Sequence, residues 1–439
     1  MTGSLRTVHV ALVEDERVLL DDAGRLPAFT RDVEADGPHP TATASTLLAD
    51  AAHLGPVVVL DGANRLHVVG PRDGVPDSGR WVALDDLPAG VREPVTTVVR
   101  QHRGTPPAGR PDWYAPRWHD EVEAWLDAVL AGRGRRRTGP LRTHRVWSIS
   151  AVHTVATDRG TLWFKASCEH FSAEAAIVET IARHLPDLVP EVVAVERRRG
   201  WLLTEPLPGR EAAGAPADVA RALAPLWAAA QVASLGWLDE LRGAGAPDRG
   251  LDATLSSWRE ALANPELDGL SDDERRRLGE VVPVVEARLR ELWACGFPDT
   301  LGHGDLHDGN VARDGADLRV FDWSDGCITH PFLDGTHLAH WISERDGGDA
   351  ADRTPAVLAP WREAFPNADF DRAVELAPLA DTVFQTVTFD RLTRAGEAGT
   401  GDLDGVVLML TRKVLAAAGP QPRIGIRTSR SSATSTARS

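Results

Sequence analysis

The chain has 439 residues, of which 43% are hydrophobic and 26% charged, a composition typical of globular proteins with two or three domains. It contains no run of about 18 consecutive apolar residues, and its three cysteines stand far apart. These features argue against a membrane-spanning chain and a disulfide framework, so we expect a cytoplasmic protein with no membrane partner.

The formal net charge of −16 comes from the C-terminal part of the chain. Residues 207–420 hold 36 acidic and 20 basic residues, and the rest of the chain holds 28 of each. This acidic region makes nucleic acid an unfavourable partner. We interpret the basic stretch at 133–145 as a solvated linker and expect the serine-rich tail, residues 421–439, to be disordered.

The first predicted unit, residues 1–104, has an α/β pattern and is called the front domain. Residues 43–55 have the apolar spacing of a helix that ends on Gly55. Apolar runs predict strands at residues 8–13, 18–20, 56–60 and 65–70. The last two of these strands are predicted to form a hairpin around Asp61-Gly62.

With the closing segment WVALDDLP at residues 81–88, the front domain resembles a Nudix-type domain. That family holds Mg²⁺ with a cluster of glutamates, whereas the equivalent helix of this sequence offers only Asp50. The resemblance therefore implies a degenerate domain without pyrophosphatase activity. A small accessory α/β domain with no such ancestry is the alternative interpretation.

Residues 118–206 are predicted to form a β-rich N-lobe with a leading helix at 118–132. That helix has Val122, Trp125, Val129 and Leu130 on one face. The order that follows is strand, strand, helix, strand, strand, at residues 146–157, 160–167, 172–185, 189–196 and 200–207. Residues 207–420 are predicted to form a mostly helical C-lobe, interrupted around residues 303–310 and by a strand at 318–323.

The octapeptide HGDLHDGN, residues 303–310, carries the densest group of reactive side chains in the sequence. A metal-hydrolase interpretation takes His303, Asp305 and His307 as ligands, since alternate residues of a strand face one side. A polar structural turn is a second interpretation, and a phosphoryl-transfer loop is the third.

The phosphoryl-transfer interpretation explains more of the sequence. Asp305 and Asn310 have the spacing of the kinase catalytic loop, H-R-D-x-x-x-x-N, in which the aspartate accepts the proton of the attacking hydroxyl. A turn at Asp314-Gly315 and an apolar strand then lead to Asp322. A hairpin of that length returns Asp322 beside Asn310, where both could bind one Mg²⁺ ion.

The pattern H-G-D-L-H-x-G-N, followed by a strand and Asp-Trp, resembles the aminoglycoside phosphotransferase and choline-kinase group of protein-kinase-like small-molecule kinases. The resemblance covers about residues 147–418 and implies an α+β, two-lobed kinase-like fold that uses ATP and Mg²⁺. This sequence reads DWSDGC where many members have Asp-Trp-Glu or Asp-Phe-Glu. Asp325 is therefore the candidate for a second acidic metal ligand.

Lys165 and Lys413 are the only lysines among 48 basic residues. Lys165 ends a predicted strand that is followed by a helix, as the nucleotide-binding lysine of kinases does. Its expected partner is Glu174, because Glu179 lies about 140° further around the helix and points away.

The same resemblance implies the remaining nucleotide contacts. Thr204 and Glu205 are predicted to form the hinge that holds adenine. Ser148 and Ser150 are predicted to cover the phosphates in a loop without glycine.

The resemblance implies that Asp305 is the catalytic base and that Asn310 and Asp322 hold the metal. His303 and His307 are expected to support the loop or touch substrate, as is Trp323 beside the cleft. Asp334 is interpreted as a structural cap.

The acidic C-lobe favours a cationic acceptor, an amino sugar or aminoglycoside, with a neutral sugar or other small alcohol as the alternative. An inactive nucleotide-binding pseudokinase is the remaining alternative. Candidates for lining the acceptor pocket are Asp325, Asp381, Asp390, Gln385 and Trp323.

Overall fold

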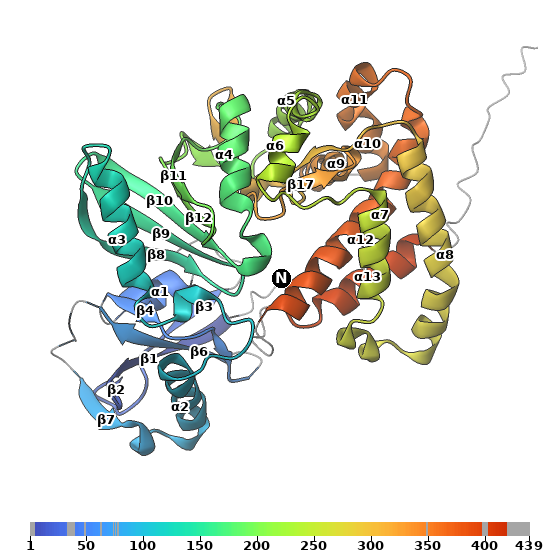
Figure 1. The fold of residues 1–439 in the computed structure, drawn as a ribbon. Helices are drawn as coiled ribbons and strands as arrows, with labels where there is room; N and C mark the ends of the chain where they lie inside the picture. Colours follow the sequence, from blue (N-terminus) through green and yellow to red (C-terminus); the bar gives the residue numbers. More distant parts are fainter. Residues whose placement is uncertain are drawn as a thin grey trace, which may run out of the picture.

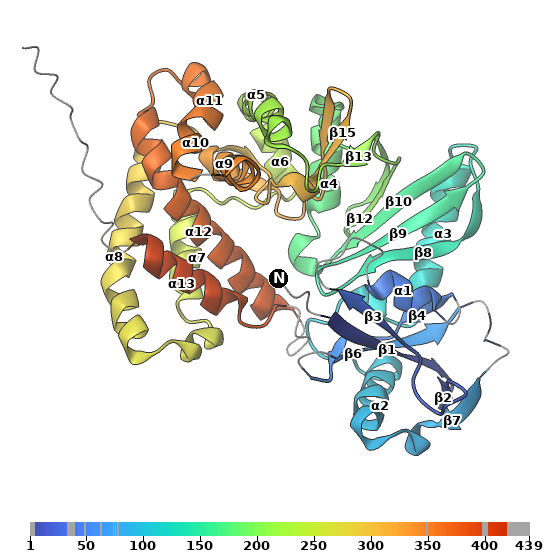
Figure 2. The same ribbon diagram turned by 180° about the vertical axis from the view of Figure 1, so that it is seen from behind.

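The computed structural model describes residues 5–32, 40–47, 50–61, 64–72, 74, 76, 79–347, 350–396 and 403–418. Figure 1 shows three bodies: the front domain lies against the β-rich N-lobe, and the helical C-lobe lies beside both. The reverse view in Figure 2 shows the same arrangement. The predicted α+β plan is thereby confirmed. The boundaries at residues 104, 118 and 207 stay predictions, and the predicted disordered tail lies outside the described residues.

The front domain contains a mixed seven-stranded sheet with the order β4-β6-β1-β2-β7, to which β3 and β5 are added at β1 and β6. Strand β1 runs parallel to β6 and antiparallel to β2. The strands are β1 (Leu5–Glu14), β2 (Arg17–Leu20), β3 (Ala28–Asp32), β4 (Ala51–His53), β5 (Val58–Val59), β6 (Asn64–Pro71) and β7 (Arg80–Ala83). The helices are α1 (Pro40–Thr46), η1 (Leu84–Asp86) and α2 (Ala89–Arg103).

The predicted helix at residues 43–55 is wrong over most of its length. Helix α1 ends at Thr46, and β4 pairs antiparallel with β6. Ala51 and His53 are buried and Ala52 is half-buried, which is the period of a strand and not of a helix. The predicted hairpin of β5 and β6 is confirmed by the pairing of Val58 with Leu66, although Gly62 of its turn lies outside the described residues.

Helix α2 was not predicted, because its β-branched residues and internal proline disfavour a helix locally. In the fold, Val95, Val98 and Val99 are buried in the core of the front domain. Their spacing of three and four residues fits one helix face, so tertiary packing overrides the local preference.

The N-lobe is an antiparallel five-stranded sheet with the order β11-β12-β10-β9-β8. The four predicted strands and the helix between them are confirmed. The elements are η2 (Asp112–Tyr114), α3 (Trp118–Ala131), β8 (Arg137–Val146), β9 (Ser150–Thr157), β10 (Gly160–Ser167), η3 (Glu169–Phe171), α4 (Glu174–His184), β11 (Val192–Glu196) and β12 (Trp201–Thr204).

The basic stretch interpreted as a linker is instead the edge strand β8. Its register pairs Leu141 with Val155 and Val146 with Ala151 of β9. Three arginines of the basic stretch form ion pairs: Arg137 with Glu123 and Asp127 of α3, Arg136 with Asp158, and Arg135 with Glu205. These acids are 10 to 70 positions away in the sequence, so the local composition does not reveal the pairing.

Helix α3 covers the outer face of this sheet. The prediction of its buried face was right for Val122 and Leu130. Leu126 is fully buried where Trp125 and Val129 were expected, and those two side chains are partly buried at the edge of the same core.

The C-lobe holds most of the helices and the largest core, which includes Trp227, Trp258, Trp323 and Trp361. Its helices are α5 (Ala217–Ser234), α6 (Leu238–Gly243), α7 (Leu251–Ala261), η4 (Pro265–Gly269), α8 (Asp272–Ala294), η5 (Asp308–Asn310), α9 (Phe332–Asp346), α10 (Ala350–Val357), α11 (Ala359–Ala364), α12 (Phe370–Ala395) and α13 (Val406–Ala418). Its strands are β13 (Arg210–Glu211), β14 (Thr300–Gly302), β15 (Val311–Asp314), β16 (Asp317–Val320) and β17 (Cys327–Thr329).

Residues 303–310 connect β14 to the β15–β16 hairpin. The hairpin pairs Val311 with Val320, and Phe321 N–H donates a 2.9 Å hydrogen bond to Asn310 O. This pairing returns Asp322 to the Asn310 end of the hairpin, as predicted.

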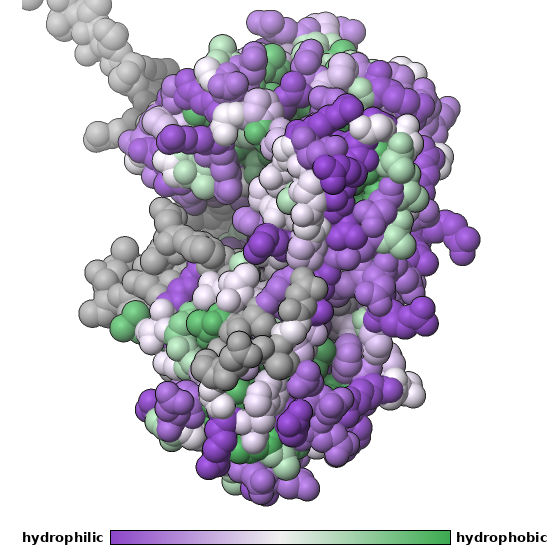
Figure 3. Space-filling model, turned by 90° about the vertical axis from the view of Figure 1, so that its left-hand side faces the viewer, coloured by the Kyte–Doolittle hydropathy of each residue, from purple (hydrophilic) through white to green (hydrophobic). Residues whose placement is uncertain are grey.

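The surface on the α3 side of the molecule is largely hydrophilic, with small groups of apolar residues scattered over it (Figure 3). Among the described residues, no helix combines the length and apolar character needed to cross a membrane.

Candidate active site

A cavity of about 570 Å³ lies between the two lobes. Lys165 and Thr204 line it from the N-lobe sheet, whereas Asn310 and Asp322 line it from the C-lobe. Glu205 also lines it, from the segment that joins the lobes. The fold thus brings together predicted site residues that are up to 157 positions apart in sequence.

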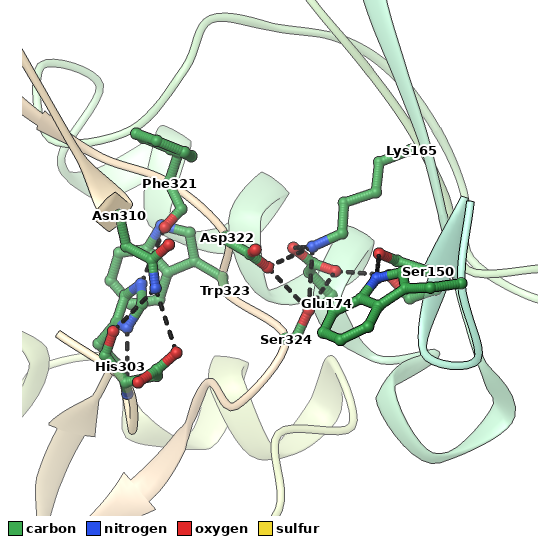
Figure 4. Close-up of polar contacts among 12 residues, drawn as sticks. Ser150, Lys165, Glu174, His303, Asn310, Phe321, Asp322, Trp323 and Ser324 are labelled. Carbon is green, nitrogen blue, oxygen red and sulfur yellow. Dashed lines mark hydrogen bonds and ion pairs between the residues drawn. The ribbon is translucent and has the colours of Figure 1, made fainter. Parts of the chain in front are cut away.

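Lys165 is the centre of a polar network that includes the buried Glu174 and the partly exposed Asp322 (Figure 4). Its Nζ donates to Glu174 Oε1 at 2.7 Å, to Asp322 Oδ1 at 2.5 Å and to Ser324 Oγ at 2.9 Å. Ser167 Oγ donates to Glu174 Oε2 from the same strand as Lys165. Glu174 was the preferred partner, and Glu179 instead pairs with Arg197.

The charges in this network hold each other ionised. Burial alone would lower the pKa of Lys165, but the charges of Asp322 and Glu174 outweigh burial and raise that pKa above its ordinary value. Burial alone would raise the pKa of Asp322, yet the charge and hydrogen bond of Lys165 lower it. Asp322 also has a left-handed backbone with φ of 60°, a conformation that non-glycine residues adopt at a cost, often at functional sites.

Buried side chains hold the backbone of the octapeptide in place. Asp334, 1% exposed, accepts hydrogen bonds from the N–H groups of His303 and Gly304, both at 2.9 Å. His303 is fully buried; its Nδ1 accepts from Asp305 N–H and its Nε2 donates to Phe321 O at 3.0 Å. Burial lowers the pKa of His303, so the ring is neutral. Asp334 and His303 therefore fix the loop.

Asp305 is half-exposed at the front of this loop. Asn310 Nδ2 donates to Asp305 O at 2.9 Å and to its Oδ2 at 3.3 Å, which leaves Asn310 Oδ1 as the atom able to bind a cation. His307 Nε2 lies 3.4 Å from Asp305 Oδ2. Burial alone would raise the pKa of Asp305, but the hydrogen bond and charge of His307 lower it. Asp305 is thus an ionised carboxylate that can accept a proton.

His303 and Trp323 are core residues. The Trp323 ring is fully buried, its Nε1 donates to Val320 O, and it packs against His303 with the ring centroids 4.8 Å apart. Both nitrogens of His303 are used within the protein. Among the described residues, no group of three or more His, Cys, Asp or Glu side chains could hold a metal ion, which argues against the three-ligand hydrolase interpretation.

The predicted hinge lines the cavity, but one of its backbone donors is already used. Glu205 N–H donates to Glu191 O at 2.9 Å. Pro206 has no N–H, so it has no backbone hydrogen to donate. The Glu205 carboxylate pairs with Arg135 at 2.5 Å, and therefore this side chain ties the hinge to the segment before β8.

The two predicted serines do not line the cavity. Ser148 and Ser150 are 9% and 6% exposed, and neither is among the described residues that line it. Ser150 Oγ accepts a 2.9 Å hydrogen bond from Trp147 Nε1. Ser150 therefore stabilises the loop from within, and the side chains of Ser148 and Ser150 do not line the cavity.

The acceptor side of the loop is bordered by α12. Gln385 Nε2 donates to Gly304 O at 2.8 Å, which ties α12 to the catalytic loop. Asp325 packs against Gly304, and its Oδ1 is buried with no hydrogen-bond partner among the described residues. Burial and the charge of Asp305 raise the pKa of Asp325 to about 7.

The other acidic candidates are internally paired. Asp381 Oδ1 accepts from His337 Nε2 at 2.8 Å. Burial would lower the pKa of His337, but Asp381 raises it to about 9. Asp390 is buried and accepts hydrogen bonds from Asn264 and Arg394, so it serves to hold helices together.

Several site residues escaped the sequence analysis. Ser324 contacts Lys165, Glu174 and Asp322 at once, and its signal was only its position two residues after Asp322. Arg135 was assigned to the linker. A family of aligned sequences would be needed to single out either residue.

Comparisons with known proteins give one family match. The model of a family described as "APH: Phosphotransferase enzyme family" matches residues 144–375, more than half of the chain. No curated protein sequence matches the chain.

Several solved structures are similar at low identity. Macrolide 2'-phosphotransferase MphH from Brachybacterium faecium is 19% identical, with 68% of this chain and 99% of that chain covered and a TM-score of 0.44. The GDP complex of aminoglycoside 2'-phosphotransferase-IIIa is 15% identical, with 67% and 98% covered and a TM-score of 0.44. Choline kinase LicA from Streptococcus pneumoniae is 11% identical, with 68% and 99% covered and a TM-score of 0.47.

Proposed function

The chain belongs to the phosphotransferase enzyme family matched at residues 144–375, and we propose that it transfers the γ-phosphate of ATP, with Mg²⁺, to a hydroxyl group of an amino sugar or aminoglycoside. Family membership makes it a small-molecule phosphotransferase with an alcohol acceptor and confirms the expected protein-kinase-like fold. Nucleotide, metal and acceptor are parts of the proposal.

The observation that carries the proposal is the meeting of Lys165, Asp322 and Asn310 in one cavity, with Asp305 at its edge. Phosphoryl transfer needs a fixed cation for the nucleotide phosphates, oxygen ligands for Mg²⁺ and a carboxylate for the attacking hydroxyl. In the proposed roles, Lys165 binds phosphate oxygens and is oriented by Glu174. Asp305 orients the acceptor hydroxyl and accepts its proton.

The donor set fits Mg²⁺. Asn310 Oδ1 and the Asp322 carboxylate are oxygen ligands, and Mg²⁺ is typically held by one or two protein carboxylates together with substrate phosphates. A cluster of three protein ligands is therefore not needed. When bound, the ion would neutralise charge on the transferring phosphate. Asp325 lies beside Asp305 and is kept as a candidate second acidic ligand.

An ammonium group on the acceptor is favoured by the unpaired oxygen of Asp325, since a buried carboxylate without a partner is stabilised by a bound cation. The acidic C-lobe would also attract such an acceptor.

A neutral sugar is the second candidate, and a specific observation favours it. Arg249 is 7% exposed and lies near Asp325, with its guanidinium over the Phe384 ring at 3.4 Å. Arg391 donates to Ser257 Oγ at 2.6 Å. Arg249 donates to Thr388 Oγ1 at 2.6 Å and to Phe384 O at 2.9 Å, and neither of these acceptors is a carboxylate. These positive charges oppose a highly cationic acceptor.

The test is a coupled ADP-release screen of the purified chain, with ATP and Mg²⁺, over aminoglycosides, amino sugars, neutral disaccharides, choline and homoserine. Turnover with an amine-bearing acceptor supports the proposal, and turnover with neutral sugars alone selects the second candidate. If the chain binds Mg·ADP but turns over no acceptor, the pseudokinase alternative is favoured. Absence of nucleotide binding would contradict both the kinase proposal and the pseudokinase alternative.

We propose that the front domain has no pyrophosphatase activity. Helix α1 contains no acidic residue and α2 contains only Glu93, so neither helix offers a cluster of metal-binding glutamates. Phosphate release from nucleoside diphosphate derivatives by the full chain carrying Asp305→Asn would contradict this prediction.

A further inference from the structure

A buried hydrogen bond joins the front domain to the end of β8, next to residues that line the cavity. Helix α1 packs against β8, and near its start Thr41 Oγ1 accepts a 3.0 Å hydrogen bond from Val146 N–H. Thr41 is 5% exposed and Val146 is 6% exposed, so water does not compete for this bond. Val146 is the last residue of β8, and the loop of residues 147–149 begins directly after it.

The loop of residues 147–149 is held at both ends and contains no glycine. Trp147 N–H donates to Ser150 O at 3.1 Å, and Ile149 O accepts from Cys168 N–H at 3.0 Å. Cys168 follows the strand that carries Lys165. The strand ends flanking the loop line the cavity through His144, Arg145 and Val152. A stiff loop of this kind takes its position from its ends.

Thr41 is in turn fixed from inside the front domain. His53 of β4 donates from Nε2 to Thr41 O at 3.0 Å, and burial lowers the pKa of His53 to about 4, so the ring is neutral. Arg72 donates to Leu141 O of β8 at 2.8 Å and contacts Glu123 of α3. The front domain is thus anchored to the strand that ends at the loop.

Resting on the proposed function, we propose that Thr41 is a positioning residue for phosphotransfer. Its hydroxyl fixes the start of the loop of residues 147–149 over the nucleotide phosphates, and the front domain thereby contributes to nucleotide binding. Without that acceptor, the buried Val146 N–H has no hydrogen-bond partner, and the loop start shifts or loosens to find one.

The test compares three full-length variants by calorimetric titration with Mg·ADP and by thermal unfolding. Thr41→Val keeps the branched shape and removes the hydroxyl, and Thr41→Ser keeps the hydroxyl. Thr46→Val is the matched control on the same helix, because Thr46 is exposed and its hydroxyl bonds within the helix to Ala42 O.

We expect Thr41→Val to weaken Mg·ADP binding about 3- to 10-fold, the effect of one lost hydrogen bond, and to raise the KM for ATP more than it changes kcat. Thr41→Ser and Thr46→Val should bind as the wild type does. A folded Thr41→Val protein with wild-type Mg·ADP affinity would overturn the proposal, as would a lower melting temperature with no change in affinity.

A second measurement uses the wild type and does not depend on a variant that folds. Binding energies are reciprocal, so Mg·ADP should slow hydrogen exchange in residues 141–152 and also in residues 40–47 and 50–53. Slowing in residues 141–152 alone would show that the front domain is not coupled to Mg·ADP binding. No binding of Mg·ADP to the wild type would instead defeat the proposed function and this inference with it.

Discussion

On the nucleotide side of the cleft, Lys165 contacts three oxygen atoms within 2.9 Å, whereas on the acceptor side Asp325 has a buried oxygen with no hydrogen-bond partner among the described residues. The first arrangement holds its charges ionised, because each one faces an opposite charge. The second keeps a carboxylate uncompensated, which raises its pKa to about 7. In the proposed roles, the nucleotide side is therefore charge-compensated by the protein's own residues, whereas the acceptor side is completed by the molecule that binds there.

The catalytic loop lies between these two sides, and its variant should give the largest effect. Asp305→Asn keeps the shape but cannot accept a proton, so kcat should fall by about 1,000-fold in the ADP-release assay while Mg·ADP affinity changes little. Asp314→Asn, in the exposed turn of the β15–β16 hairpin, is the control. Equal losses for both variants would show that the loop carboxylate has no special role.

The second-largest effect, a loss of kcat/KM for ATP, is expected from Lys165→Arg. The three oxygens around Nζ suit a compact ammonium and not a planar fork. Since hydrogen bonds to charged groups contribute about 1.5–3 kcal/mol, kcat/KM for ATP should fall about 10- to 100-fold. Lys413→Arg, at the exposed second lysine, should have no effect. A Lys165→Arg enzyme with the wild-type kcat/KM for ATP would refute the proposed phosphate contact.

Gln385→Ala tests the link between α12 and the loop. It removes the hydrogen bond to Gly304 O, and a loss of one such bond should reduce kcat by about 3- to 10-fold without weakening Mg·ADP binding. Glu375→Gln, at the exposed start of α12, serves as the control. If Gln385→Ala weakened Mg·ADP binding as much as it lowered kcat, the proposed division of the cleft into a nucleotide side and an acceptor side would be wrong.

The smallest effect concerns stability and pH. The folded pKa of Asp325 is about 7 against 3.8 for an ordinary aspartate, so its ionisation opposes folding and stability is lost as pH rises from about 4 to 7. Asp325→Asn removes this penalty. Its melting temperature should exceed that of the wild type by a few degrees at pH 8, on the order of 2–4 °C, and by less at pH 4. A difference independent of pH would show that Asp325 is already compensated.

The parts of the site that could be predicted are those whose geometry is local. Asp305, Asn310 and Asp322 lie on one loop and hairpin, and the register of a hairpin follows from its turn and length. Lys165 and Glu174 are nine residues apart across a strand and the helix after it. The rotation of about 140° between Glu174 and Glu179 around the helix selected Glu174 as the partner.

The errors arose where distant segments decide the structure. Residues 51–53 join a sheet because β6 lies beside them, and Arg137 of β8 forms ion pairs with two acids of α3. Ser150 was expected to face phosphates, but its hydroxyl accepts a hydrogen bond from Trp147 within the loop.

The sequence by itself determined the phosphotransferase family pattern, the catalytic loop and the pairing of Lys165 with Glu174, because these depend on spacing within one element or between two consecutive ones. Only the tertiary structure decided the rest. The bonds from Gln385 to Gly304, from Lys165 to Asp322 and from Val146 to Thr41 join residues 81, 157 and 105 positions apart. Such contacts depend on how helices and sheets pack against one another, and local residue patterns carry no direct record of that packing.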